Sequence, residues 1–171
     1  IPSAKLEVAG NTSIGTGNSL QGIYGLAVGT SHVLSNYHSI TVGVSDSVYG
    51  NHSLAAGQSN RVDGETSTAL GYRNRVTGNT AFAAGTNHTV AGTFSAVFNN
   101  GNSSTANATT SIAGGFQSQT QANLSLAIGY ADTASGQVSA VFGHGNYTRS
   151  YGEFVAGTFA TDYTANDPNG F

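Results

Sequence analysis

The sequence predicts an all-β protein, a parallel β-roll (a β-solenoid) of about eleven 14-residue coils, and three observations predict it. Glycines recur every fourteen residues, two apolar columns precede each glycine, and a second column of small residues follows half a period later. A fixed period of this kind indicates stacked copies of one small structural unit. The repeat positions are Gly15, Gly29, Gly43, Gly57, Gly71, Gly85, Asn99 and, after a two-residue slip, Gly115, Gly129, Gly143 and Gly157.

A strand is predicted around each repeat glycine. Apolar residues lie three positions and one position before it, as Leu126 and Ile128 do before Gly129, and residues two apart share one face of a strand. A small residue, here Ala127, lies between them, and Ser125 lies directly before them. We expect the large apolar residues to point into the roll and the small ones to form a smooth outer face.

A second, shorter strand is predicted half a period later. Its apolar column lies five residues after the glycine, and a column rich in glycine follows two residues further on; the first holds Leu20, Leu34, Val48, Val62, Val76 and Val90, the second Gly22, Asn36, Gly50, Gly64, Gly78 and Gly92. Each unit is therefore strand, turn, strand, turn, with Gly or Asn expected to supply positive φ at the bends. Coils stacked at ~4.8 Å form a rod about 50 Å long.

The repeats divide the chain into three parts. Residues 1–10 precede them as a strand or cap, with Lys5–Val8 alternating polar and apolar residues; 11–158 form the repeat domain; and 159–171 form a C-terminal cap or junction. The two-residue insertion falls within 99–114, where the polar run Asn99–Thr110 indicates a surface loop. Because the chain opens at Ile1, we interpret it as a processed or excised piece.

A single rod of this kind has little core. At ~25 cal/mol per Å² of buried apolar surface against ~1.5 kcal/mol of ordering entropy per residue, its stability is marginal. Small side chains allow another backbone to approach closely, so we expect identical chains to associate along the small-residue face, most simply as a parallel homotrimer.

Composition argues against several classes of function. The net charge is −3 and only 8% of residues are charged, so the chain lacks the basic surface that nucleic acids require. No apolar run is long enough to insert into a membrane in this segment. No nucleophile elbow is present, and the histidines at 32, 38, 52, 88 and 144 form no ligand cluster, so we expect neither an enzyme nor a metal or cofactor site.

The repeat unit resembles that of a known family. Asn123–Gly129 (NLSLAIG) and Asn51–Gly57 (NHSLAAG) are similar to the head repeats of trimeric autotransporter adhesins of the YadA type, and the likeness covers about residues 11–158. It implies a left-handed β-roll assembled as a tight trimer, located at the cell surface, which binds host matrix proteins or cells. Similar repeats occur in phage tail fibres and other surface fibres.

One column carries candidate ligand-binding residues. Directly after the repeat glycine lie Tyr72, Phe116, Tyr130 and His144, of which the last three occupy consecutive coils. If exposed, they form an aromatic ladder suited to a surface glycan or to the side chains of a matrix protein. Packing of the ladder against itself is the alternative.

Two further surface features are predicted. Arg61 and Arg75 stack in adjacent coils beside Asp63, which indicates a solvated ion-pair patch. The chain also contains sequons for N-glycosylation in a host that glycosylates, at Asn11, Asn51, Asn87, Asn102, Asn107, Asn123 and Asn146.

These observations favour a non-enzymatic, extracellular adhesin head. The alternative is a structural subunit of an extracellular filament or phage tail fibre, joined end to end through residues 1–10 and 159–171.

Overall fold

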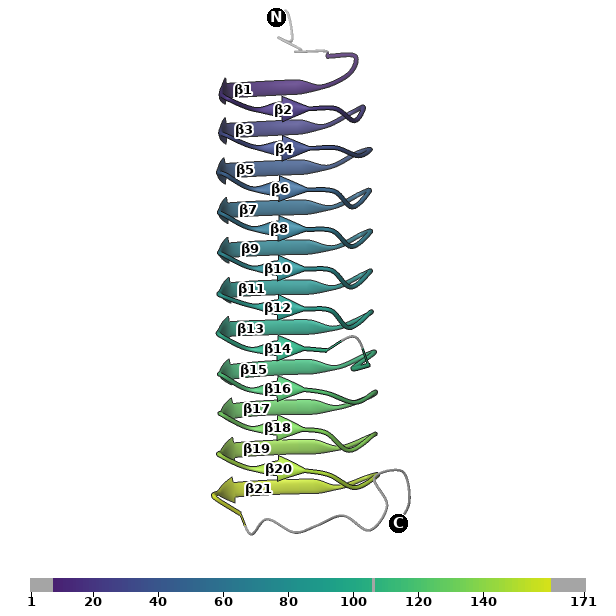
Figure 1. Cartoon of the computed structure of the whole chain (residues 1–171), viewed down its shortest axis with the longest axis vertical. Coiled ribbons are helices and arrows are strands. Elements are labelled where there is room, and N and C mark those ends of the chain that lie inside the picture. Colours follow the sequence, from purple (N-terminus) through teal and green to yellow (C-terminus); the bar gives the residue numbers. More distant parts are fainter. Residues whose placement is uncertain (1–7, 106, 161–171) are drawn as a thin grey trace, which may run out of the picture.

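The chain forms a rod of two parallel β-sheets, as Figure 1 shows. A computed structural model describes residues 8–105 and 107–160. The eleven-stranded sheet contains β1 (Thr12–Thr16), β3 (Leu26–Thr30), β5 (Ile40–Val44), β7 (Leu54–Gln58), β9 (Thr68–Tyr72), β11 (Phe82–Thr86), β13 (Ala96–Asn100), β15 (Ile112–Phe116), β17 (Leu126–Tyr130), β19 (Ala140–His144) and β21 (Phe154–Thr158). The ten-stranded sheet contains β2 (Ser19–Leu20), β4 (Val33–Leu34), β6 (Ser47–Val48), β8 (Arg61–Val62), β10 (Arg75–Val76), β12 (Thr89–Val90), β14 (Ser103–Ser104), β16 (Gln119–Thr120), β18 (Thr133–Ala134) and β20 (Tyr147–Thr148).

The register follows the 14-residue period. Gly57 pairs with Gly43 on one side and with Gly71 on the other, and every pairing among the described strands is parallel. Hydrogen bonds run from coil to coil, as from Leu54 N to Ser67 O at 3.0 Å. The predicted all-β solenoid of alternating strands and turns is confirmed, and the described residues contain no helix.

The two-residue insertion lies in one turn. Across it Ala96 pairs with Ile112, and both strands of that coil are formed, so the extra residues fall between β14 and β15. The surface loop predicted over Asn99–Thr110 is thus shorter than expected. Asn99 takes the place of the repeat glycine with φ 79°, in the left-handed region that Asn tolerates better than most residues.

The faces of the long strands are the reverse of those predicted. The small residues point inward, since Ala55, Ala69 and Ala83 are fully buried, whereas Ile40 and Ile128 are 41% and 40% exposed. Alternation along a strand defines two faces but not which one is buried. The large residues therefore point outward, and the small-residue face cannot be the surface on which other chains associate.

The apolar core is a narrow strip between the sheets. Alanines of the long strands lie opposite valines of the short strands, and Val97 of β13 and Ala81 before β11 join them. The cluster is made of Val48, Ala55, Val62, Ala69, Val76, Ala81, Ala83, Val90, Val97 and Ala113. Serines before the long strands complete the interior. Ser53 Oγ, for example, donates to Gly64 O at 3.0 Å and accepts from Ser67 N at 3.1 Å. The inward side is thus made of small residues tied together by hydrogen bonds.

Glycine is required in the two glycine columns for different reasons. Gly57 has the predicted positive φ, +128°, but it lies within β7 rather than at a bend, and a Cβ there would also lie 2.0 Å from Gly71 O. Gly64 does not have positive φ, so that prediction is wrong for its column; a Cβ there would lie 1.9 Å from Gly78 O. At the bends, positive φ belongs to other residues, such as Ser59 at 58° and Thr66 at 53°.

Parts of the terminal predictions fall outside the described residues. The strand predicted over Lys5–Val8 lies almost wholly among residues 1–7, which the structure does not describe, and the same holds for 161–171 of the predicted C-terminal cap. Of that cap, Phe159 is described, and its ring centroid lies 4.5 Å from that of His144.

Candidate functional site

The outward face of the long sheet is strongly apolar. Because the alanines alternate inward, the flanking large residues of each long strand point away from the core. Those exposed over more than about a third of their surface are Ile14, Ile40, Val42, Val44, Phe98, Ile112, Phe116, Ile128, Tyr130 and Phe154. They belong to β1, β5, β13, β15, β17 and β21, and the outward apolar residues of the other long strands, such as Leu54, Leu70 and Phe82, are half-buried. An exposed apolar surface of this extent indicates an interaction site.

The predicted aromatic ladder forms in three consecutive coils. Phe116 and Tyr130 stack with ring centroids 5.1 Å apart at 17°, and Tyr130 meets His144 edge to face at 4.6 Å and 74°. Phe116 and Tyr130 thus cover one face of each other, whereas Tyr130 and His144 are in contact edge to face. The parts of the rings left uncovered remain for a ligand, and Tyr130 is 48% exposed.

Tyr72 does not join this ladder. Thr86 and Asn100 occupy the same column between it and Phe116. Its ring instead lies under the guanidinium of Arg73, with Cζ 4.8 Å from the ring centroid. The structure thus brings together three of the four predicted ligand-binding residues.

A second ladder was predicted only in part, because the spacing places His38 and His52 in one column of neighbouring coils but Tyr24 was not included. Tyr24 stacks on His38 at 5.2 Å, and His38 on His52 at 5.1 Å, all three being exposed at the bend before the long strands. The fourteen-residue spacing of Tyr24 from His38 was the available signal. Among the residues that the structure describes, no group of three or more His, Cys, Asp or Glu side chains could hold a metal ion.

A buried polar column was also missed. Three residues after each repeat position, the side chain points between the sheets, and the buried members are His32, Asp46, Asn60, Asn74, His88, Asn102, Ser118, Asp132 and Asn146. The signal was present, because this position is Asn, His, Asp or Ser in consecutive coils. Polar residues at a turn are ordinarily exposed, so the residue types revealed the column but not that it is buried.

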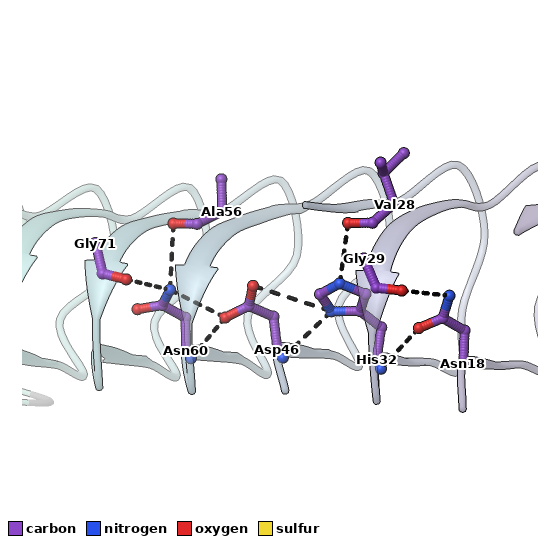
Figure 2. A network of polar contacts seen from close by, with 8 residues as sticks. All are labelled: Asn18, Val28, Gly29, His32, Asp46, Ala56, Asn60 and Gly71. Atoms are coloured by element: carbon purple, nitrogen blue, oxygen red, sulfur yellow. Dashed lines mark hydrogen bonds and ion pairs between the residues drawn. The ribbon is translucent and has the colours of Figure 1, made fainter. Parts of the chain in front are cut away.

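Hydrogen bonds join this column from coil to coil, as Figure 2 shows. Asn60 Nδ2 donates to Ala56 O at 3.2 Å, to Gly71 O at 2.8 Å and to Asp46 Oδ1 at 3.1 Å. Its Oδ1 accepts from the backbone nitrogen of Asn74 at 3.1 Å. The column ties both sheets together, and it is structural rather than open to a ligand.

His32 and His88 occupy this column, and both ring nitrogens of each lie within hydrogen-bond distance of backbone atoms. Nε2 of His88 lies 3.2 Å from Ala84 O, which only accepts, so Nε2 carries the proton, while Nδ1 accepts from Asn102 N at 3.3 Å. Burial lowers the pKa of His88, and its backbone hydrogen bonds oppose that shift more weakly. Both nitrogens are used, which leaves none for a metal ion.

Of the predicted ion-pair patch, the pair of Arg61 and Asp63 forms. Arg61 Nε donates to both oxygens of Asp63 at 2.9 Å, and its guanidinium lies 4.7 Å from the centre of the Tyr49 ring. Asp63 raises the pKa of Arg61. Arg75 is exposed and lies in register beside Arg61.

The predicted glycosylation sites divide by exposure. Asn11, Asn87, Asn107 and Asn123 are exposed, and Asn51 is half-buried. Asn102 and Asn146 are 1% and 0% exposed, and both belong to the buried polar column. A glycan on either would displace hydrogen bonds inside the rod, so these two drop out as candidates.

No protein-family model matches the sequence, and no curated protein is similar to it. Within the described residues, no helix has the length and apolar character needed to cross a bilayer.

Proposed function

We propose that the chain is the non-enzymatic head of an extracellular adhesin, assembled as a homotrimer through the outward face of the long sheet. The observation that carries the proposal is the apolar surface that follows the rod from β1 to β21. The YadA-type resemblance of the repeats supports the same reading.

A second copy is the occupant that best fits this surface. The face repeats with the period of the rod, so only a partner with the same period can place an apolar residue against every coil. A parallel copy of this chain has that period. Burying residues such as Val42 and Ile128 between copies removes from water the apolar surface that a lone rod leaves exposed.

The association is tested by substitution on this face. Sedimentation equilibrium should give a mass of three chains for the native sequence and of one chain for the double variant Val42→Lys, Ile128→Lys. Gln119→Lys is the matched control, because Gln119 is exposed on the short sheet instead. A native chain that stays monomeric, or a trimer that the double variant leaves intact, contradicts the proposed interface.

Ligand binding is assigned to the aromatic ladder of Phe116, Tyr130 and His144. These residues are the last of β15, β17 and β19, at the edge of the outward face, whereas the trimer interface is assigned to the columns before the repeat position, such as that of Val42 and Ile128. Ring edges present a narrow apolar strip, which suits the side chains of a matrix protein or the apolar side of a surface glycan. The variant Phe116→Ser, Tyr130→Ser should lose binding to arrays of matrix proteins and glycans while keeping its circular dichroism spectrum. Tyr24→Ser in the second ladder is the control; unchanged binding in the double variant removes the site.

A filament subunit is the second candidate. All described strands are parallel, so β1 of one copy has the direction needed to extend the sheet beyond β21 of another. Electron microscopy of native material distinguishes the candidates, since an adhesin gives short heads and a filament gives continuous fibres. Deleting residues 1–10 should stop filaments from forming and leave a head intact.

A further inference from the structure

Asp46 and Asp132 are acids in the buried polar column, and each is fully buried. One oxygen of each carboxyl is well placed: Oδ1 of Asp46 accepts from Asn60 N at 2.8 Å, and Oδ1 of Asp132 from Asn146 N at 2.8 Å. In the described part of the chain, Oδ2 of both residues is buried without a hydrogen-bond partner. A buried, unpaired carboxylate oxygen is costly and requires an explanation.

Elsewhere in this column the atom in that place is a donor. Asn60 Nδ2 donates to the backbone oxygens of Ala56 and Gly71, at 3.2 and 2.8 Å (Figure 2). Asn146 Nδ2 makes the equivalent pair of bonds at 3.0 and 2.7 Å. His32 Nε2 reaches the equivalent carbonyl at 3.1 Å. The surroundings of this position are therefore built from carbonyl oxygens, which accept.

Oδ2 of the acids lies where these donors lie. In Asp46 as in Asn60, Oδ1 accepts from the backbone nitrogen of the next coil, so the remaining atom takes the donor's place. A Cβ built on Gly129 would lie 2.3 Å from Asp132 Oδ2, just as one on Gly143 would lie 2.9 Å from Asn146 Nδ2. A carboxylate here sets an acceptor among acceptors, whereas a carboxylic acid supplies the missing O–H.

We propose that Asp46 and Asp132 are neutral carboxylic acids in the folded rod, each donating its O–H to backbone carbonyl oxygen, and that they form two latches which weaken as the pH rises. Loss of the proton leaves a buried negative charge facing carbonyl oxygens. The rod therefore holds its coils together more firmly in acid than in alkali.

His32 is the titratable neighbour of Asp46. His32 Nδ1 lies 4.0 Å from Asp46 Oδ2, but it accepts from Asp46 N at 3.3 Å, and Nε2 carries the ring proton. In this arrangement Nδ1 has no proton to donate to the carboxyl. Burial raises the pKa of Asp46, and the hydrogen bonds from Asn60, followed by His32, lower it less.

Asp132 has polar neighbours and one titratable one. Ser118 and Asn146 flank it within the column, and His144 belongs to the aromatic ladder outside. Burial raises the pKa of Asp132, and the Asn146 amide, His144 and the Gly143 amide lower it less.

The direction of the pH effect follows from these shifts. Folding raises both pKa values above the ordinary 3.8, so the folded chain binds more protons than the unfolded chain above that pH. The stabilising contribution is complete below the ordinary value and is lost as the pH rises through the folded-state values. Within that window each acid lowers the folding equilibrium constant about tenfold per pH unit, and both together about a hundredfold.

Infrared titration of the full chain tests protonation directly. The band of protonated carboxyl groups should persist at pH values where exposed carboxyls have ionised, should weaken in Asp46→Asn and Asp132→Asn singly, and should vanish in the double variant. If every carboxyl of the native chain ionises together near the ordinary aspartate pKa, the proposal is wrong.

Unfolding at fixed protein concentration tests the consequence. The double Asp→Asn variant should match the native chain in acid, exceed its stability in mild alkali and lose the steep fall between the two. Asn74→Asp, which adds an acid to the same column, should steepen that fall, whereas Asp63→Asn on the surface should leave it unchanged. A double variant with the native pH dependence overturns the latch.

Discussion

The substitution Gly57→Ala adds a single carbon atom, Cβ, and so tests how closely the coils stack. The new Cβ would lie 2.0 Å from Gly71 O, at a residue with φ +128°. Strained backbone of this kind costs roughly 1–3 kcal/mol, and overpacking that forces neighbouring backbone to move typically costs ~1–3 kcal/mol. We expect a loss of about 2–6 kcal/mol, a large share of the ~5–15 kcal/mol that stabilises an ordinary domain.

Two other glycines separate these contributions. Gly157 has φ +142°, but among the described residues a Cβ there would meet nothing within 4 Å beyond its chain neighbours, so Gly157→Ala reports the backbone strain alone. Gly64 lacks positive φ, and its Cβ would lie 1.9 Å from Gly78 O, so Gly64→Ala reports the overlap alone. Denaturant unfolding followed by circular dichroism, at one protein concentration, should show Gly57→Ala as the most destabilised. Equal stability of Gly57→Ala and Gly157→Ala would refute close contact between coils.

Three other predictions concern the core, the polar column and modification. Val62→Ala, at a fully buried valine, should lower the free energy of unfolding by ~1–3 kcal/mol, and Val33→Ala at a half-buried one by less, in the same denaturant assay. Asn74→Leu leaves buried carbonyls without a donor and should cost ~3 kcal/mol or more in thermal or denaturant unfolding. In a glycosylating host, peptide mass mapping of the folded, secreted chain should find glycan on Asn123 and none on Asn146.

The repeat and its strands could be predicted from sequence because each depends on spacing alone. Gly129 returns fourteen residues after Gly115, and that interval fixes which residues pair in the sheet. The stacking of Phe116 on Tyr130 followed for the same reason, since residues one period apart must be neighbours.

The inside and outside of the rod could not be predicted in the same way. Hydrophobicity favoured burial of Ile128 over Ala127, yet Ala127 is buried and Ile128 is 40% exposed. The space between the sheets holds alanines opposite valines. For the column of Asn60 the residue type favoured exposure, and only its bonds to the coils on either side explain why it lies inside.

This arrangement of polarity links the stability of the rod to association. The interior contributes narrow apolar contacts and many hydrogen bonds, and a hydrogen bond formed in exchange for water adds only about 0.5–1.5 kcal/mol. The larger apolar side chains, such as Val42 and Ile128, point outward, where they contribute only if another surface covers them. If copies associate as we propose, much of the hydrophobic stabilisation of each rod is held between chains rather than within one. The buried polar column then fixes the register of the coils within one chain, and the outward face of the long sheet holds neighbouring chains together.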